Sequence, residues 1–175
     1  VEQLPSLRKQ YPNYADYREQ TVEDMFSPAQ LENSLRLEAY RMESMVFWND
    51  GQGSFSGRVL PPQAQFAPMY GGLVTQLDGG GDPEVLLGGN LWEVKPEAGR
   101  YDASYGVHLQ LDNRGQDYRA MPGPQSGFVV EGAVRQILQV ATPQGPRVVV
   151  LRNDAAPAWF GGIRSSAQTT DNGQG

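Results

Sequence analysis

The chain repeats itself at a spacing of 63 residues, and this repeat limits its fold more than any other feature. When the sequence is compared with itself at that offset, without gaps, two separate hairpin-like blocks coincide. The matched segments are 74–77 with 137–140, 85–87 with 148–150, Asn90 with Asn153, Trp48 with Leu111, 49–50 with 112–113, Phe55 with Tyr118, and Pro61 with Pro124. One offset shared by two hairpins predicts a structural unit that occurs more than once.

Each unit consists of short apolar segments joined by turns rich in Gly, Asn and Asp. The turn Asn49-Asp50-Gly51 is typical, because these residues tolerate the positive φ of tight β-turns. Four strands per repeated unit are typical of a β-propeller blade. We therefore predict an all-β fold, a partial β-propeller of about two four-stranded blades, with a half blade at 44–61, a full blade at 66–124 and a partial blade at 128–160.

The two ends of the chain differ from these predicted blades. Residues 1–33 are predicted to be helical, with a capping box at Thr21-Val22-Glu23-Asp24 and an N-cap at Ser27 before Pro28. The blades then span 34–161, and the polar end at 162–175 is predicted to be a flexible tail. Since two blades cannot close a ring, we expect the chain to be the terminal part of a larger propeller, or to complete one made by another chain.

Composition excludes several classes of function. The chain has 175 residues and a formal net charge of −6, so a basic surface for nucleic acid is not expected. It has no cysteine, which excludes disulfides and thiol catalysis. No apolar run is long enough to predict a membrane span.

Several blocks resemble the C-terminal region of FG-GAP/VCBS-repeat proteins, the integrin-like β-propeller proteins of the Bacteroidota that occur with UnbV-type repeats. The blocks are QAQFAPMYG at 63–71, QLDGGGDPEVLLGGN at 76–90 and VKPEAGRYDASYG at 94–106, within a resemblance that covers about 4–160. It implies a secreted or cell-surface protein, with calcium in loops between blade strands. Members of this family are several times longer than this chain.

The loop at 76–84 corresponds to the calcium loop of that family, in which acidic residues alternate with glycines. Here Gln76, Asp78, Asp82 and Glu84 are the candidate ligands, and Gln76 and Gly80 stand where the family has aspartates. Each lost carboxylate weakens calcium binding. We interpret this as a degenerate calcium loop with weak or absent binding, and a glycine-rich turn with surface acids is the favoured alternative. The corresponding loop at 141–145 has no acidic residue.

The segment 92–102 is a long, charged and aromatic connection between two predicted strands of one blade. Long loops on a rigid scaffold often bind ligands, and Trp92, Arg100 and Tyr101 are of the residue types enriched in binding hot spots. These three residues form a candidate binding loop. The alternative is that Arg100 pairs with Asp102 while Tyr101 packs between blades.

The sequence contains few candidate catalytic residues, and their spacing matches no catalytic motif. His108 is the only histidine and is predicted to be a structural residue of a strand. Carboxylate pairs such as Glu93 with Glu97, or Asp102 with Asp112, would suit glycoside hydrolysis, although no spacing singles them out.

The leading hypothesis is a non-enzymatic structural or interaction module of a surface-exposed or secreted propeller that binds protein or glycan. Its partners would be the remaining blades of a larger propeller or another protein chain. An accessory subunit of an outer-membrane or extracellular assembly is the second hypothesis. A carbohydrate-active enzyme that uses propeller carboxylates is the third.

Overall fold

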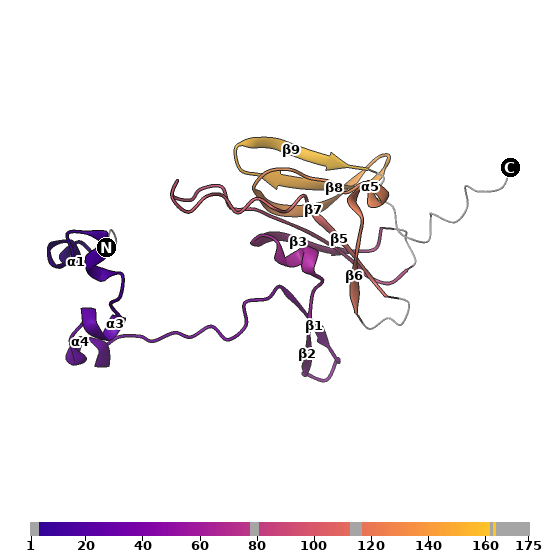
Figure 1. Cartoon of the computed structure of the whole chain (residues 1–175). Coiled ribbons are helices and arrows are strands. Elements are labelled where there is room, and N and C mark those ends of the chain that lie inside the picture. The colour runs from indigo at the N-terminus through magenta and orange to yellow at the C-terminus, as the bar shows by residue number, and fades with distance from the viewer. Residues whose placement is uncertain (1–3, 78–80, 113–116, 162, 164–175) are drawn as a thin grey trace. The chain divides into compact units, whose positions relative to one another are not determined.

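A computed structural model describes residues 4–77, 81–112, 117–161 and 163 of the chain (Figure 1). The chain divides into two compact units, Val1–Met42 and Glu43–Gly175. The predicted loop residue Asp78 and nearly all of the predicted tail at 162–175 lie outside the described residues.

The first unit contains short helices, and all but the first begin at a capping residue, Asn13, Thr21 or Ser27. They are α1 (Pro5–Gln10), α2 (Tyr14–Tyr17), α3 (Val22–Met25) and α4 (Pro28–Glu32). The predicted capping box before α3 is formed, since the backbone N–H of Thr21 donates to Asp24 Oδ2 at 2.9 Å. Ser27 caps α4, and its backbone N–H donates to Gln30 Oε1 at 2.9 Å. No helix in the described part of the chain is both long and apolar enough to cross a membrane.

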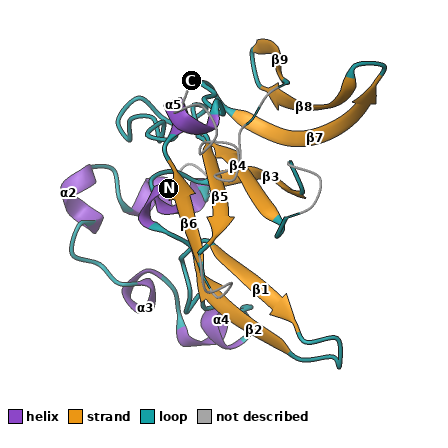
Figure 2. Ribbon diagram, turned by 90° about the vertical axis from the view of Figure 1, so that its right-hand side faces the viewer, coloured by secondary structure: helices purple, strands orange, loops and turns teal. Residues whose placement is uncertain are grey.

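The second unit is built from three antiparallel sheets that follow one another in chain order (Figure 2). The first sheet is a hairpin of β1 and β2, the second has the order β3-β4-β5-β6, and the third has the order β7-β8-β9. The elements are β1 (Met45–Asn49), β2 (Phe55–Val59), η1 (Pro62–Gln65), β3 (Met69–Thr75), β4 (Glu84–Gly89), β5 (Val107–Leu111), β6 (Tyr118–Met121), α5 (Gly123–Ser126), β7 (Val134–Thr142), β8 (Gly145–Arg152) and β9 (Ala155–Phe160). The prediction of an all-β class is confirmed, because the described residues are mostly antiparallel sheet with a few short helices.

The four-stranded sheet is buried on both faces, and each face packs against a different element. Because successive residues of a strand point to opposite faces, β4 directs Val85 to one side and Leu86 to the other. The side of Val85 forms a cluster with Leu60, Ala64, Val107 and Leu109, to which Val46 of β1 adds. The side of Leu86 forms a cluster with the third sheet and the segments that flank it: Phe128, Val130, Val134, Ile137, Val148, Val150 and Ile163. Full burial of a leucine such as Leu86, which is 0% exposed, contributes roughly 2 kcal/mol.

The 63-residue repeat holds for β4 and β8 but not for the strands that precede them. Glu84 lies opposite Thr75 in the first hairpin, and Arg147 lies opposite Val140 in the second. The strands β4 and β8 are therefore related by 63 residues and β3 and β7 by 65. The ungapped comparison is thus wrong by two residues for β3 and β7, and by one residue for β1 and β5, where Asn49 rather than Trp48 corresponds to Leu111. The difference lies in the intervening turn, whose length does not affect the two buried faces.

Glycines in the second sheet let the third sheet approach closely. A Cβ atom added at Gly88 of β4 would lie 2.8 Å from Cγ1 of Val134. At Gly71 of β3, the same methyl group of Val134 would lie 3.1 Å away. The β-branched side chain of Val134 cannot swing aside freely, so the two sheets would have to separate to make room.

We expect Gly88→Ala to lower the free energy of unfolding by about 1–3 kcal/mol, because the added methyl group overpacks the contact between the two sheets. Urea denaturation measures this. Gly72→Ala is the matched control, since its Cβ would meet only Leu87 Cδ2, at an ordinary 3.4 Å. Equal stability of the two variants would contradict the close approach of the sheets.

Candidate functional site

The connection between β4 and β5 begins at a buried asparagine that holds it to the sheets. Asn90 is 3% exposed and has a φ of 80°, a left-handed conformation that turns the chain out of β4. Its Nδ2 donates to the carbonyl oxygens of Ser104, at 2.7 Å, and Gly132, at 3.1 Å. Its Oδ1 accepts the backbone N–H of Ser104 at 3.0 Å. One side chain therefore ties together the start of the connection, its end, and the segment before the third sheet.

A pair of backbone hydrogen bonds then closes the loop above Asn90. Leu91 N donates to Tyr101 O at 2.8 Å, and Tyr101 N donates to Leu91 O at 3.0 Å. The residues between them are a long excursion that extends away from the sheets (Figure 1). Such a bridge limits the motion of a loop at its base while leaving its side chains open to solvent.

The three predicted binding residues lie at the base of this excursion. The guanidinium carbon of Arg100 lies 5.1 Å from the ring centroid of Trp92, a cation–π contact. Trp92 is half-buried, and its ring edge also lies near Gly132. Tyr101 is 52% exposed, so it does not pack fully between sheets. The structure thus brings Trp92 and Arg100 into direct contact, which the sequence did not predict.

A second aromatic–arginine contact lies beneath the connection and joins the second and third sheets. Tyr70 and Arg135 are the bulged residues of β3 and β7, and the Arg135 guanidinium carbon lies 4.6 Å from the Tyr70 ring centroid. Arg135 Nη1 also donates to the carbonyl oxygen of Asn90 at 3.0 Å. A β-bulge re-aims a side chain at the sheet margin, and here two bulges meet. The support of the connection therefore includes residues from both sheets.

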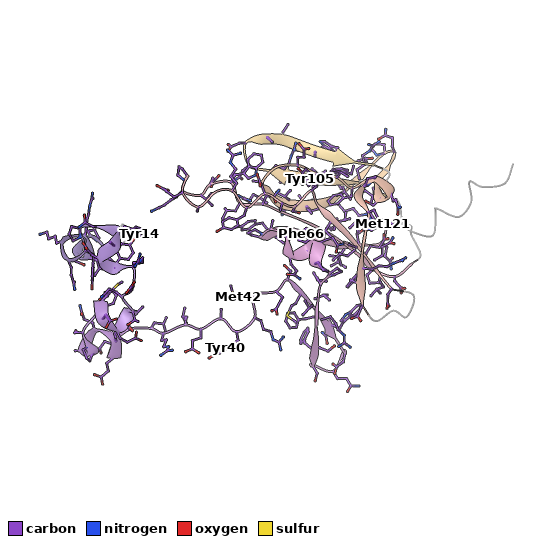
Figure 3. The ribbon with its side chains drawn as sticks, viewed as in Figure 1. Tyr14, Tyr40, Met42, Phe66, Tyr105 and Met121 are labelled. Carbon is purple, nitrogen blue, oxygen red and sulfur yellow. The ribbon has the colours of Figure 1, made fainter. Side chains whose placement is uncertain are left out.

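The carboxylates proposed for hydrolysis are dispersed: Glu93, Glu97 and Asp102 lie on this connection, whereas Asp112 lies directly after β5. Glu93 Oε1 accepts a hydrogen bond from Asn153 Nδ2 at 3.0 Å, and Glu97 and Asp102 are exposed. Side chains of the region, with Tyr105 labelled, are drawn in Figure 3. Tyr105 is 59% exposed and lies past the Leu91–Tyr101 bridge.

The residues of the predicted calcium loop have separate partners in the structure. Gln76 Nε2 donates to Gly81 O at 3.0 Å, so the amide nitrogen points to the loop backbone. Asp82 is exposed, and burial, followed by the negative charge of Asp82, raises the pKa of Tyr118. Glu84 is 5% exposed and lies within the sheet. Among the described residues, no group of three or more His, Asp or Glu side chains could hold a metal ion.

Glu84 belongs instead to a buried polar cluster with His108 and Gln110. Its Oε1 lies 3.3 Å from His108 Nε2 and accepts a hydrogen bond from Gln110 Nε2. The exposed fractions of His108 and Gln110 are 1% and 6%. Within the described parts of the chain, Glu84 Oε2, Gln110 Oε1 and both ring nitrogens of His108 have no hydrogen-bond partner. A pair this deeply buried is out of reach of a substrate from solution.

Sequence reasoning missed this cluster because its members are distant in the chain. The β4–β5 register, in which Leu86 lies opposite His108, places Glu84 on the same face as His108 and Gln110. The one available signal is the segment Val107-His108-Leu109-Gln110, in which two polar residues alternate with apolar ones. That alternation shows that His108 and Gln110 share a face, but it does not identify their partner.

We expect His108→Leu to lower the free energy of unfolding by about 3 kcal/mol, because it leaves the buried Glu84 carboxylate without its imidazole neighbour. Urea denaturation of this variant is compared with that of a variant in which Glu84, His108 and Gln110 are all leucine. The triple variant should recover most of the loss, since an apolar replacement of the whole cluster leaves no buried polar group unpaired. A triple variant less stable than His108→Leu would contradict this interpretation. Glu97→Gln serves as the exposed control.

We expect 1 mM calcium to raise the free energy of unfolding by less than about 0.5 kcal/mol. A site whose dissociation constant is about 1 mM would give a stabilisation of about this size. The reason is that Glu84 is engaged by Gln110 and His108 inside the sheet. Thermal melting with calcium and with a chelator measures the effect. Stabilisation of several kcal/mol would contradict the expectation and indicate a working calcium loop.

Comparison with known proteins identifies no relative of this chain. No family model, no curated protein and no solved structure matches it. The resemblance to FG-GAP/VCBS-repeat proteins therefore stays a prediction from the sequence, and the function has to be argued from the geometry.

Proposed function

We propose that this chain is a non-enzymatic interaction module, part of a surface-exposed or secreted β-propeller of the FG-GAP/VCBS type. The third sheet packs on one face of the second sheet, and Val46 and Trp48 of the β1–β2 hairpin contact its other side. This succession in chain order supports the propeller assignment, because propeller blades also follow one another along the chain. The first sheet has two strands and the third has three, fewer than the four of the second. Further blades, or another protein chain, would complete the ring.

One observation carries the binding role: the 91–101 loop is fixed at its base while Arg100 and Tyr101 stay exposed. Asn90 and the Leu91–Tyr101 bridge hold the loop, and the base itself rests on the sheets. The Arg100 guanidinium lies over the partly buried Trp92 ring and offers hydrogen-bond donors, and the next residue, Tyr101, adds a half-exposed ring. Rigid aromatic groups next to hydrogen-bond donors bind with little loss of conformational entropy. A glycan or a polypeptide segment would suit this surface.

A panel of soluble neutral and acidic oligosaccharides, and a library of short peptides, tests this role by NMR titration of the ¹⁵N-labelled chain. We expect a ligand that shifts the signals of the 91–101 loop. Tyr101→Ala should then weaken its binding at least about tenfold, since truncation of a central aromatic anchor is costly. Tyr105→Ala, an exposed tyrosine of the same connection outside the bridge, should have little effect.

Two results would refute the proposal. One is binding that shifts residues elsewhere and is unaffected by Tyr101→Ala. The other is turnover of any oligosaccharide in the panel that depends on Glu93, Glu97 or Asp102, because the module would then be an enzyme.

A further inference from the structure

The two ends of the sheet stack expose apolar faces that have buried counterparts inside the stack. At one end, the outer face of the β1–β2 hairpin carries Met45, Phe47, Phe55 and Val59. Phe47, Phe55 and Val59 are 60%, 63% and 54% exposed. Exposed apolar patches of this kind are uncommon on monomers and usually mark a contact surface.

The β1–β2 hairpin corresponds to the β5–β6 hairpin residue by residue. Their turns are closed by matching backbone bonds, Asp50 N to Ser54 O at 3.1 Å and Asp112 N to Asp117 O at 2.7 Å. Counting inward from these bonds along the two registers, Phe47 matches Leu109, and Phe55 matches Tyr118.

These matched positions differ sharply in burial. Leu109 is 0% exposed because it lies in the cluster to which Val46 of β1 adds. Tyr118 lies under Trp48, with ring centroids 5.9 Å apart and planes inclined by 12°. The outer face of β1–β2 therefore matches the face of the second sheet that Leu60, Ala64 and Val46 cover, but Phe47 and Phe55 on it are exposed.

At the other end, the outer face of the third sheet is more exposed than the matching face of the second sheet. A row across β3, β4 and β5 runs Leu73, Leu86, His108, and the matching row across β7, β8 and β9 runs Leu138, Val149, Trp159. The first row faces the third sheet, and Leu86 and His108 are 0% and 1% exposed. In the second row, Leu138 is 37% and Trp159 58% exposed, while Val149 between them is 6% exposed.

We propose that a second copy of this chain docks head to tail, with the outer face of its third sheet on the outer face of the β1–β2 hairpin. Within one chain, the Leu86 face of the second sheet already packs on the third sheet, and Val46 of β1 packs against the Val85 face of the second sheet. The proposed contact between two copies repeats this pairing of faces. Trp159 of β9 and Val46 of β1 both correspond to His108 of β5 in the registers described above, so the two residues occupy equivalent positions in their sheets. Trp159 of the partner copy then packs on Phe47, as Val46 packs on the cluster that contains Leu109.

The contact joins two different faces, so it is heterologous, and it leaves one free face at each end of a dimer. This arrangement rests on the proposed propeller-type stack, because it treats the sheets as successive units of one series. It does not involve the 91–101 loop. A sheet of another polypeptide that carries the same residues would fit the same faces, and it would compete with the second copy.

Two single substitutions test the arrangement in the full chain. Phe47→Arg blocks the first face, and Trp159→Arg blocks the second. Sedimentation velocity over a concentration series should show self-association of the unmodified chain. Each variant alone should associate at least about tenfold more weakly, since a charge replaces a central aromatic anchor. An equimolar mixture of the two should form a one-to-one dimer, because each variant retains the face that the other lacks.

Two matched controls make the outcome decisive. Tyr14→Arg replaces an exposed aromatic of the helical unit and should associate like the unmodified chain. Tyr101→Ala should likewise associate normally, so loss of ligand binding and loss of association can be told apart. An unmodified chain that is monomeric at every concentration, a variant that associates normally alone, or a mixture that stays monomeric would each overturn the proposal.

Discussion

Burial of both faces of the β3–β6 sheet is the constraint on which the rest of the second unit depends. A sheet with Val85 directed to one side and Leu86 to the other cannot be stable in water with only one side covered. Leu60 and Ala64, which follow the β1–β2 hairpin, cover one face together with Val46 of β1, and the third sheet covers the other. The chain order of the three sheets, their close contact at Gly88 and the apolar faces left at each end all follow from this requirement.

The same packing positions the candidate binding loop. Asn90 can bond Gly132 only because the third sheet lies against the second, and Arg135 reaches Asn90 and Tyr70 across the same boundary. The loop is therefore oriented by tertiary contacts although it contains little regular structure of its own. A binding surface built on such a base needs few ordered residues of its own.

The glycine, asparagine and apolar patterns predict much of the fold because they act over short distances. Strand alternation and turn residues place the hairpins, and Thr21 and Asp24 predict a cap that is present. The binding-loop residues are also accessible to sequence reasoning, since Trp92, Arg100 and Tyr101 stand out by type. The partner of His108 is not, because the β4–β5 register that brings Glu84 to it depends on the long connection between those strands.

The sequence by itself determined the all-β class, the hairpin repeat and the candidate loop, because periodicity and turn chemistry are local properties of the chain. Only the tertiary structure decided the two-residue shift between β3 and β7, the Trp92–Arg100 stack, and the burial of Glu84 with His108. These depend on how strands distant in sequence pair and on which faces meet. The burial of apolar surface on both sides of one sheet settles those choices.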